Sequence, residues 1–167
     1  GEELLHGPLP RTAACARAAQ GHMTANCPLC APVTPEHVLW ADRRCRIILA
    51  ADRDHPALCR VIWRLHVREM SELRAPDRAH LLRVVLAVEQ VLRRIARPAK
   101  INLASLGNQV PHLHWHVVPR FRDDAHFPGS IWSTRRRRGR KHEVDAALLA
   151  RSLRELLGAG AKKKAGH

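Results

Sequence analysis

The chain contains no tyrosine and only two phenylalanines among its 167 residues. Leucine, valine, isoleucine and four tryptophans must therefore fill most of the interior. No apolar run approaches the roughly 18 residues that a membrane-spanning helix needs, so no membrane partner is expected. The sequence also lacks a G-x-x-x-x-G-K-[ST] phosphate-binding loop, and the first 22 residues lack the basic start and apolar centre of a secretory signal. These absences argue against an integral membrane protein and against a P-loop nucleotidase.

The length fits one domain that is large enough for a proper hydrophobic core. We expect the domain at residues 23–158, after a disordered or cloning-derived segment at 1–22 and before a basic disordered tail at 159–167. Five cysteines are an odd number for a disulfide framework. Without an export signal, they indicate a reducing compartment, so a cytoplasmic location is expected.

The net charge of +14 is concentrated in two clusters, "RRRRGRK" at Arg135–Lys141 and a lysine run at Lys162–Lys164. Such charge favours phosphate-bearing ligands and nonspecific binding of nucleic acid. The simpler interpretation is a solvated, arginine-rich loop and tail, because basic runs carry little specificity. Nucleic acid is therefore kept as a candidate partner.

The order of predicted elements favours an α+β domain with an antiparallel sheet. Strands are predicted at Arg44–Ala50, Ala57–Trp63, Lys100–Leu106 and Pro111–Pro119. Helical spacing of apolar residues predicts a short helical stretch from His66, a long helix over Pro76–Ala96 and a last helix over about Glu143–Gly158.

The most informative stretch is "PHLHWHVVPR", Pro111–Arg120, in which His112, His114 and His116 occupy alternate positions. A helix would spread these positions around its axis, whereas a strand places alternate residues on one face. The pattern therefore predicts an extended segment with three imidazoles on one face. Its other face would carry three apolar side chains into the core, namely Leu113, Trp115 and Val117.

Three explanations fit the histidines. Chance placement on a solvent-facing strand is disfavoured by strict alternation over three positions. A metal site is a second explanation, because H-x-H on a strand can direct two nitrogens at one ion. Catalysis is the third, because a neutral imidazole near pH 7 is a good nucleophile and a good leaving group at phosphorus.

The same stretch resembles the signature of the histidine triad (HIT) superfamily, His-φ-His-φ-His-φ-φ with φ apolar, at all seven positions from His112 to Val118. The upstream "LGNQVP" resembles the Gly-Gln-Ser/Thr-Val-x segment that usually precedes the signature. The resemblance extends over roughly Cys27–Phe121. It implies the HIT-like fold, an antiparallel sheet of about five strands with one long and one C-terminal helix, and a homodimer.

The resemblance also implies a nucleotide hydrolase or transferase that acts at the α-phosphate of a dinucleoside polyphosphate or nucleoside phosphoramidate. In that pattern His114 attacks the phosphorus and forms a covalent nucleotidyl-histidine. His116 would contact the phosphate oxygens or the departing group, and His112 would orient its neighbours or bind metal. No Mg²⁺ requirement is expected from the pattern.

Further positions match residues that contact the substrate in relatives. Asn102 matches an asparagine near the phosphate or ribose, although an asparagine bonding backbone at a strand edge is an equal alternative. Asp52 resembles the aspartate that receives the ribose hydroxyls. Gln109 stands where the family usually has Ser or Thr, and Asn108 stands where it has Gln. Leu58 stands in place of a fourth histidine that is common in the family.

The single C-x-x-C pair, Cys27 and Cys30, is only half of a zinc site, and such a pair alone is a weak signal. Branches of the HIT family that carry this pair complete a Cys₂His₂ site with a histidine after the second strand and the first histidine of the triad. These are His66 and His112 here, which implies a structural Zn²⁺. The alternatives are a reduced cysteine pair near the surface and, for His66, replacement by His80.

Three functions stay open. One of them is a histidine trio that binds a catalytic metal and takes no nucleotide. The second is the HIT enzyme. The third is a zinc-stabilised nucleotide- or nucleic-acid-binding module with weak or lost catalysis, favoured by Leu58, Gln109 and the basic clusters.

Overall fold

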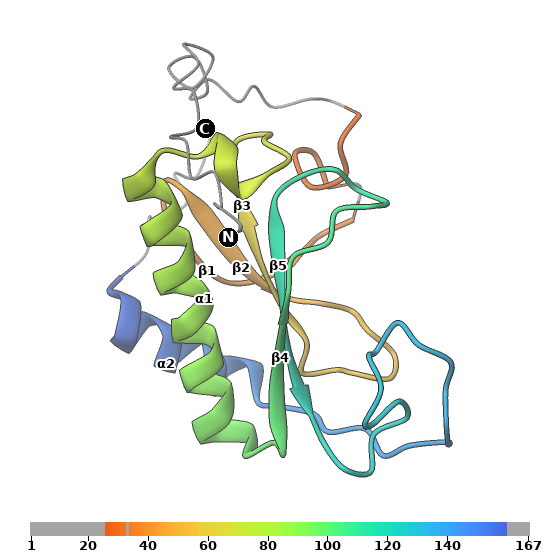
Figure 1. The fold of residues 1–167 in the computed structure, drawn as a ribbon. Helices are drawn as coiled ribbons and strands as arrows, with labels where there is room; N and C mark the ends of the chain where they lie inside the picture. The colour runs from red at the N-terminus through yellow and green to blue at the C-terminus, as the bar shows by residue number, and fades with distance from the viewer. Residues whose placement is uncertain (1–25, 33, 160–167) are drawn as a thin grey trace, which may run out of the picture.

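The computed structural model describes residues 26–32 and 34–159 (Figure 1). The predictions for residues 1–22 and for most of the basic tail therefore concern residues outside the described part. The described residues form one antiparallel sheet in the order β1-β2-β3-β5-β4, which confirms the predicted α+β class. Its strands are β1 (His37–Ala41), β2 (Cys45–Leu49), β3 (Cys59–Trp63), β4 (Lys100–Ala104) and β5 (His114–Arg120).

The predicted strands are all present but shorter, and β1 is an additional strand. β1 was not predicted because its five residues do not keep a clean period of two, and its pairing with β2 shifts register between Val38 and Trp40. β5 begins at His114 and continues through Pro119 to Arg120. The expectation that all three histidines lie within the strand is therefore wrong for His112, which precedes it.

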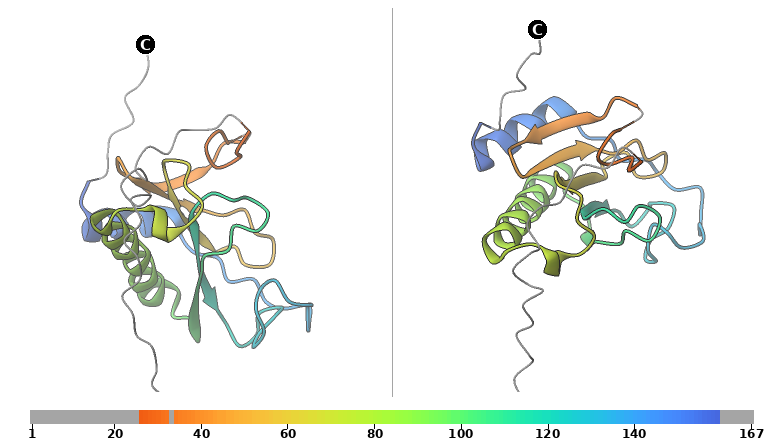
Figure 2. Two further views of the ribbon diagram at one scale, coloured as in Figure 1. Left: turned by 45° about the horizontal axis from the view of Figure 1, so that its top comes forward. Right: turned by 90° about the horizontal axis from the view of Figure 1, so that it is seen from above.

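Two α-helices, α1 (Ala75–Ala96) and α2 (Ala146–Leu157), cover one face of the sheet (Figures 1 and 2). Pro76 lies in the first turn of α1, and the Asp145 carboxylate accepts hydrogen bonds from two backbone amides at the start of α2. The helical stretch predicted from His66 is reduced to the 3-10 turn η2 (Met70–Glu72). No helix in the described part of the chain is long and apolar enough to cross a membrane.

The core lies between the helices and the sheet. Leu113 and Val117 are buried in it and Trp115 packs against it, as the alternation predicted. Because side chains alternate along a strand, His114 and His116 point to the opposite face, which the helices leave uncovered. The register adds Arg60 of β3 to that face as the cross-strand partner of His116.

The segment 121–145, which follows β5, contains no helix or strand and lies beside the β2–β3 loop, 50–58 (Figure 1). A buried ion pair holds its beginning, since the Arg120 guanidinium donates two hydrogen bonds to Asp124 at 2.8 and 3.0 Å. The arginine segment, 135–141, is anchored by Arg137, which donates to the backbone carbonyls of Arg122, Asp124 and Phe127. The run is exposed, as predicted, and it follows a defined path.

Candidate functional site

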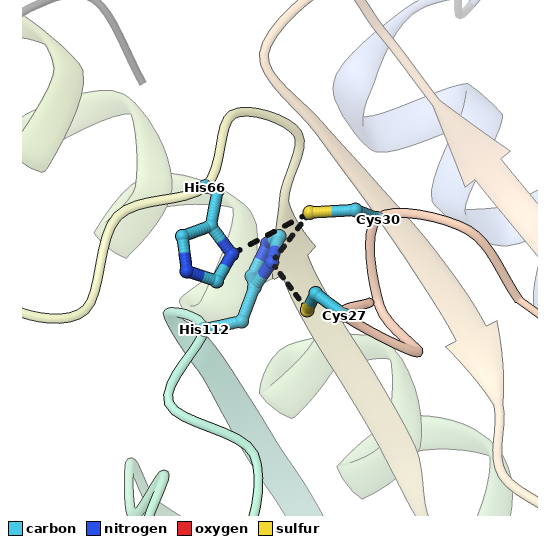
Figure 3. Close-up of side chains that lie close together, drawn as sticks. All are labelled: Cys27, Cys30, His66 and His112. Atoms are coloured by element: carbon cyan, nitrogen blue, oxygen red, sulfur yellow. Dashed lines mark hydrogen bonds between the residues drawn. The ribbon is translucent and has the colours of Figure 1, made fainter. Parts of the chain in front are cut away.

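Four metal-binding side chains converge at one end of the sheet from three segments that are distant in sequence (Figure 3). Cys27 and Cys30 come from a turn in which the amides of Cys30 and Ala31 both donate to the carbonyl of Cys27. His66 lies in the loop after β3, and His112 lies just before β5. The Nδ1 atom of His112 is 3.4 Å from both sulfur atoms, and Nδ1 of His66 is 3.5 Å from Sγ of Cys30.

This arrangement fits zinc in two respects. Zn–S bonds of about 2.3 Å and Zn–N bonds of about 2.0–2.1 Å imply roughly 3.5 Å between sulfur and nitrogen ligands of a tetrahedral ion, which agrees with the three distances. In addition, Nε2 of His112 lies 2.6 Å from the carbonyl oxygen of Trp63 and donates to it. That bond leaves the Nδ1 lone pair directed at the cysteines, as in a metal ligand held by a backbone carbonyl.

His80 is not part of this cluster. It lies on α1, where Nε2 is 2.8 Å from the carboxylate of Asp42 and 3.9 Å from Sγ of Cys45. Its side chain is only 12% exposed, and His80 does not replace His66 in the cluster. The Arg83 guanidinium lies 3.2 Å from Nδ1 of His80 and donates to it, so His80 presents Nε2–H to Asp42.

The other two histidines of the trio face each other. Nε2 of His114 lies 3.1 Å from Nε2 of His116. The Nδ1–H group of His114 donates to the carbonyl of His112 at 2.6 Å, and this bond leaves a lone pair on its Nε2. Because Nε2 of His114 is then an acceptor, the bond between the two rings must be donated by Nε2–H of His116. The Nδ1 atom of His116 is buried without a hydrogen-bond partner among the described residues.

Both rings are neutral near pH 7. Burial lowers the pKa of His114, partly opposed by its bond to the His112 carbonyl, and the positive charge of Arg60 lowers it further. Burial together with the charges of His114 and Arg60 lowers the pKa of His116 to about 4. A neutral His114 with a lone pair on Nε2 has the protonation state that a nucleophile at phosphorus requires.

A profile of the HIT domain matches residues 31–123, more than half of the chain. The chain belongs to the HIT family. No curated protein matches the sequence. Among solved structures, a histidine triad protein from Marinobacter aquaeolei is 30% identical with a TM-score of 0.59, and the match covers 73% of this chain and 88% of that one.

A histidine triad protein from Sinorhizobium meliloti is 26% identical with a TM-score of 0.59, covering 72% of this chain and 88% of that one. A zinc-bound histidine triad family protein from Mycobacterium smegmatis is 23% identical with a TM-score of 0.54, covering 79% of this chain and 93% of that one. These similarities confirm the HIT-like fold, with its five antiparallel strands, one long helix and one C-terminal helix.

Asn102 and Asp52 occupy different positions around this HIT site. Asn102 lies on β4, where its Oδ1 accepts a hydrogen bond from Arg120 at 2.8 Å, and this leaves its amide N–H groups to donate elsewhere. Asp52 lies half-buried in the β2–β3 loop, and its Oδ1 accepts from the backbone amides of Asp54 and His55. Both residues are thus held by neighbouring groups and keep part of their hydrogen-bonding capacity.

Asn108 and Gln109 are exposed on the loop between β4 and β5. No hydrogen bond between either side chain and the described residues brings them to the histidine pair. Gly107 opens this turn with a φ of 92°, a conformation that favours glycine. Leu58, which replaces the fourth histidine, is 2% exposed and packs with Ala50 and Val118, so this position is apolar here.

A cavity of about 450 Å³ lies along β4 and includes Asn102, Val118 and Trp132 in its lining. It does not contain His114 or His116. Trp132 lies between the cavity and the histidine pair, because it lines the cavity and its ring meets the His116 ring edge-on at 5.2 Å between centroids. The indole is 51% exposed while His116 is 6% exposed, so Trp132, in the segment 121–145, covers part of the His116 ring.

Sequence reasoning missed two residues beside the histidines, Trp132 and Arg60. Trp132 comes from a segment with no periodic pattern, so nothing in the sequence placed it there. Arg60 gave a weak signal, because it is the only charged residue in the apolar run "ALCRVIW". A second histidine pair, His55 and His126, is also buried on loops, with Nε2 of His55 3.0 Å from Nδ1 of His126.

Proposed function

We propose that this HIT protein is a nucleotide hydrolase or transferase that cleaves at the α-phosphate through a covalent nucleotidyl-histidine. The observation that carries the proposal is the state of His114. Its Nδ1–H is fixed on the backbone carbonyl of His112, its Nε2 lone pair faces Nε2 of His116 at 3.1 Å, and burial lowers the pKa of the ring. Dinucleoside polyphosphates and nucleoside phosphoramidates are the proposed substrates.

In the first step, Nε2 of His114 forms a bond to the α-phosphorus, and the bond from phosphorus to the leaving group breaks with its electron pair on that group. The Nε2–H group of His116, which donates to His114 beforehand, then turns to a phosphate oxygen or to the leaving group. In the second step, the oxygen of water or of another acceptor forms a bond to phosphorus, and the bond from phosphorus to Nε2 breaks with its electron pair on Nε2. The acceptor loses its proton to solvent, and His114 returns to its neutral form. Positioning and charge stabilisation supply most of the rate in such transfers, and no Mg²⁺ is required in this scheme.

The zinc cluster has a positioning role in this proposal. A Zn²⁺ held by Cys27, Cys30, His66 and His112 would neutralise the cysteine thiolates and tie the N-terminal turn to the start of β5. The carbonyl of His112 is the group that fixes the His114 ring. The cluster therefore acts on the nucleophile through one backbone atom.

The substrate would lie on the face of the sheet opposite the helices, which carries His114 and His116. Asn102 has amide donors left for the phosphate or ribose, and Asp52 has carboxylate capacity left for ribose hydroxyls. Gln109 and Asn108 would approach the leaving group from the loop before β5, since a glutamine amide can replace a serine or threonine hydroxyl as donor.

The test is a panel of nucleotides assayed for release of mononucleotide with the wild-type protein and a His114→Ala variant. The variant should lose about a thousandfold or more of the activity, because no other described group occupies the position of the nucleophile. His37→Ala, an exposed histidine on β1, is the matched control and should retain wild-type rates.

Intact-mass measurement of quenched wild-type protein should show one added nucleotidyl group that is absent from His114→Ala. Turnover at the wild-type rate by His114→Ala would overturn the mechanism. Absence of any turnover and of any adduct, with tight and salt-sensitive binding of RNA or DNA, would instead establish a binding module. That second function is favoured by the exposed side chains of the arginine segment.

A further inference from the structure

Arg60 lies on the uncovered face of the sheet, in the middle of β3. The register pairs Arg60 with His116 on β5 and with Ile48 on β2. Its side chain is therefore flanked by Ile48 on one side and by His116 on the other. Directly paired residues of antiparallel strands share a face. The electrostatic effect agrees, because the charge of Arg60 lowers the pKa of both His114 and His116.

The Arg60 side chain has no counterion within the described part of the chain. No hydrogen bond or ion pair joins it to another described residue, and its Nε atom is buried without a partner. Other sheet arginines differ: Arg46 is bound to Glu36, and Arg120 is bound to Asp124. A partly buried guanidinium without an anion is costly, so its place beside the histidine pair indicates that an anionic ligand completes the site.

We propose that the Arg60 guanidinium binds the phosphate group of the substrate at His114. This inference rests on the proposed function for the identity of the nucleotide. A planar guanidinium can hold two phosphate oxygens at once, which would fix the phosphorus in front of Nε2 of His114. It would also stabilise the negative charge on the equatorial oxygens during transfer, without giving up a proton.

The proposal implies a substrate class. The proposal places one fixed cation at the reacting phosphate, so the site would favour phosphate anhydrides, esters and phosphoramidates that are anionic at that position. Uncharged analogues, such as nucleosides and methylphosphonate diesters, should gain nothing from Arg60.

The experiment compares the full-length zinc-loaded protein with Arg60→Gln, Arg60→Lys and Arg64→Gln. Arg64 is an exposed arginine just after β3 whose guanidinium donates to the carbonyl of Asp42, and it serves as the control. Binding of inorganic phosphate, AMP and adenosine is measured by calorimetry for each. Arg60→Gln should weaken AMP and phosphate by about tenfold or more and leave adenosine unchanged. Arg60→Lys should recover part of the affinity, and Arg64→Gln should match the wild type.

Turnover adds a second readout. Arg60→Gln should lower kcat as well as raise KM, because the cation acts on the transferred phosphoryl group and not only on binding. Equal weakening of AMP and adenosine, or unchanged phosphate binding in Arg60→Gln, would overturn the proposal. If the wild type turns over no nucleotide, the proposed activity fails, yet the comparison of phosphate binding still decides the role of Arg60. A far-ultraviolet circular dichroism melt establishes that each variant is folded, and Arg60→Lys provides the decision if Arg60→Gln is not.

Discussion

The glycine at position 139 is required for two separate reasons. Its φ of 72° lies in the left-handed region, and a Cβ atom added there would lie 2.4 and 2.6 Å from backbone atoms of Ala125. Gly158, after α2, has a similar φ of 86° but no atom within 4 Å of an added Cβ. A side chain at either position would strain the backbone, but only a side chain at Gly139 would also overlap a neighbouring segment.

We predict that Gly139→Ala destabilises the protein clearly more than Gly158→Ala. Both variants carry strain of about 1–3 kcal/mol from a positive φ. Only Gly139→Ala adds overlap with backbone that has no side-chain freedom to yield, which costs about 1–3 kcal/mol more. Urea unfolding at pH 7 measures both. Equal losses of unfolding free energy would mean that the arginine segment does not pack on Ala125.

Single residues also mark where prediction from sequence succeeds and fails. The sequence predicted that His114 and His116 share one face of the sheet, because alternate residues of a strand point to the same side. The direction of His112 depends on the Trp63 carbonyl, 49 residues away, so it followed only from the family resemblance. Arg60 was missed because one arginine in an apolar strand matches no motif, and its meaning appears only when β3 and β5 are paired.

At the scale of elements, the four side chains of the zinc cluster come from three segments that are distant in sequence. The turn at Cys27–Cys30 contains no helix or strand and packs in a small apolar cluster with Ile48 and Ile62. The loop carrying His66 and the entry to β5 complete the set. A zinc ion held by these segments would add its binding free energy to the stability of the fold.

We predict one zinc ion per chain in the purified protein, measured by elemental mass spectrometry. A Cys27→Ser/Cys30→Ser variant should lose the metal and melt at least roughly 6 °C lower, which corresponds to about 2–3 kcal/mol for a domain of this size. Its mononucleotide release should also fall, because the His112 carbonyl is no longer held.

The control is Cys59→Ala, a fully buried cysteine in the main core and outside the cluster. It should melt lower because of the cavity that it creates and yet retain the full zinc content. Full zinc in the double variant, or a chelator that lowers the melting temperature of wild type and double variant equally, would contradict the assignment.

The presence and type of the helices and strands were predicted better than the residues at which they begin and end. The long helix and four strands followed from periodicity, and the last helix was predicted three residues too early because Asp145, its actual cap, was not identified. The segment 121–145 was beyond prediction, because it is shaped by Asp124 and Arg137 through hydrogen bonds to backbone groups. Such contacts leave no periodic trace in the sequence.

At the scale of the whole molecule, one edge of the sheet is open and apolar. β4 is an edge strand, and Leu103 on it is 38% exposed. On α1, Leu82 and Leu86 are 40% and 48% exposed and lie on the same helical stripe as Glu89, which lines the cavity along β4. An unpaired strand beside an apolar helical stripe is the kind of surface that a second copy covers.

We predict that this HIT protein is a homodimer in solution, paired through β4 and α1. An antiparallel β4–β4 contact would satisfy the unpaired backbone groups of both edges and bury Leu82, Leu86 and Leu103 together. A Leu86→Lys/Leu103→Lys variant would place four cations in that interface and should shift light-scattering mass from twice 18.8 kDa to the monomer value. Leu156→Lys, on the exposed side of α2 and 48% exposed in the wild type, should stay dimeric. A monomeric wild type at tens of micromolar, or dissociation by Leu156→Lys alone, would exclude this interface, and the site would then have to be complete within one chain.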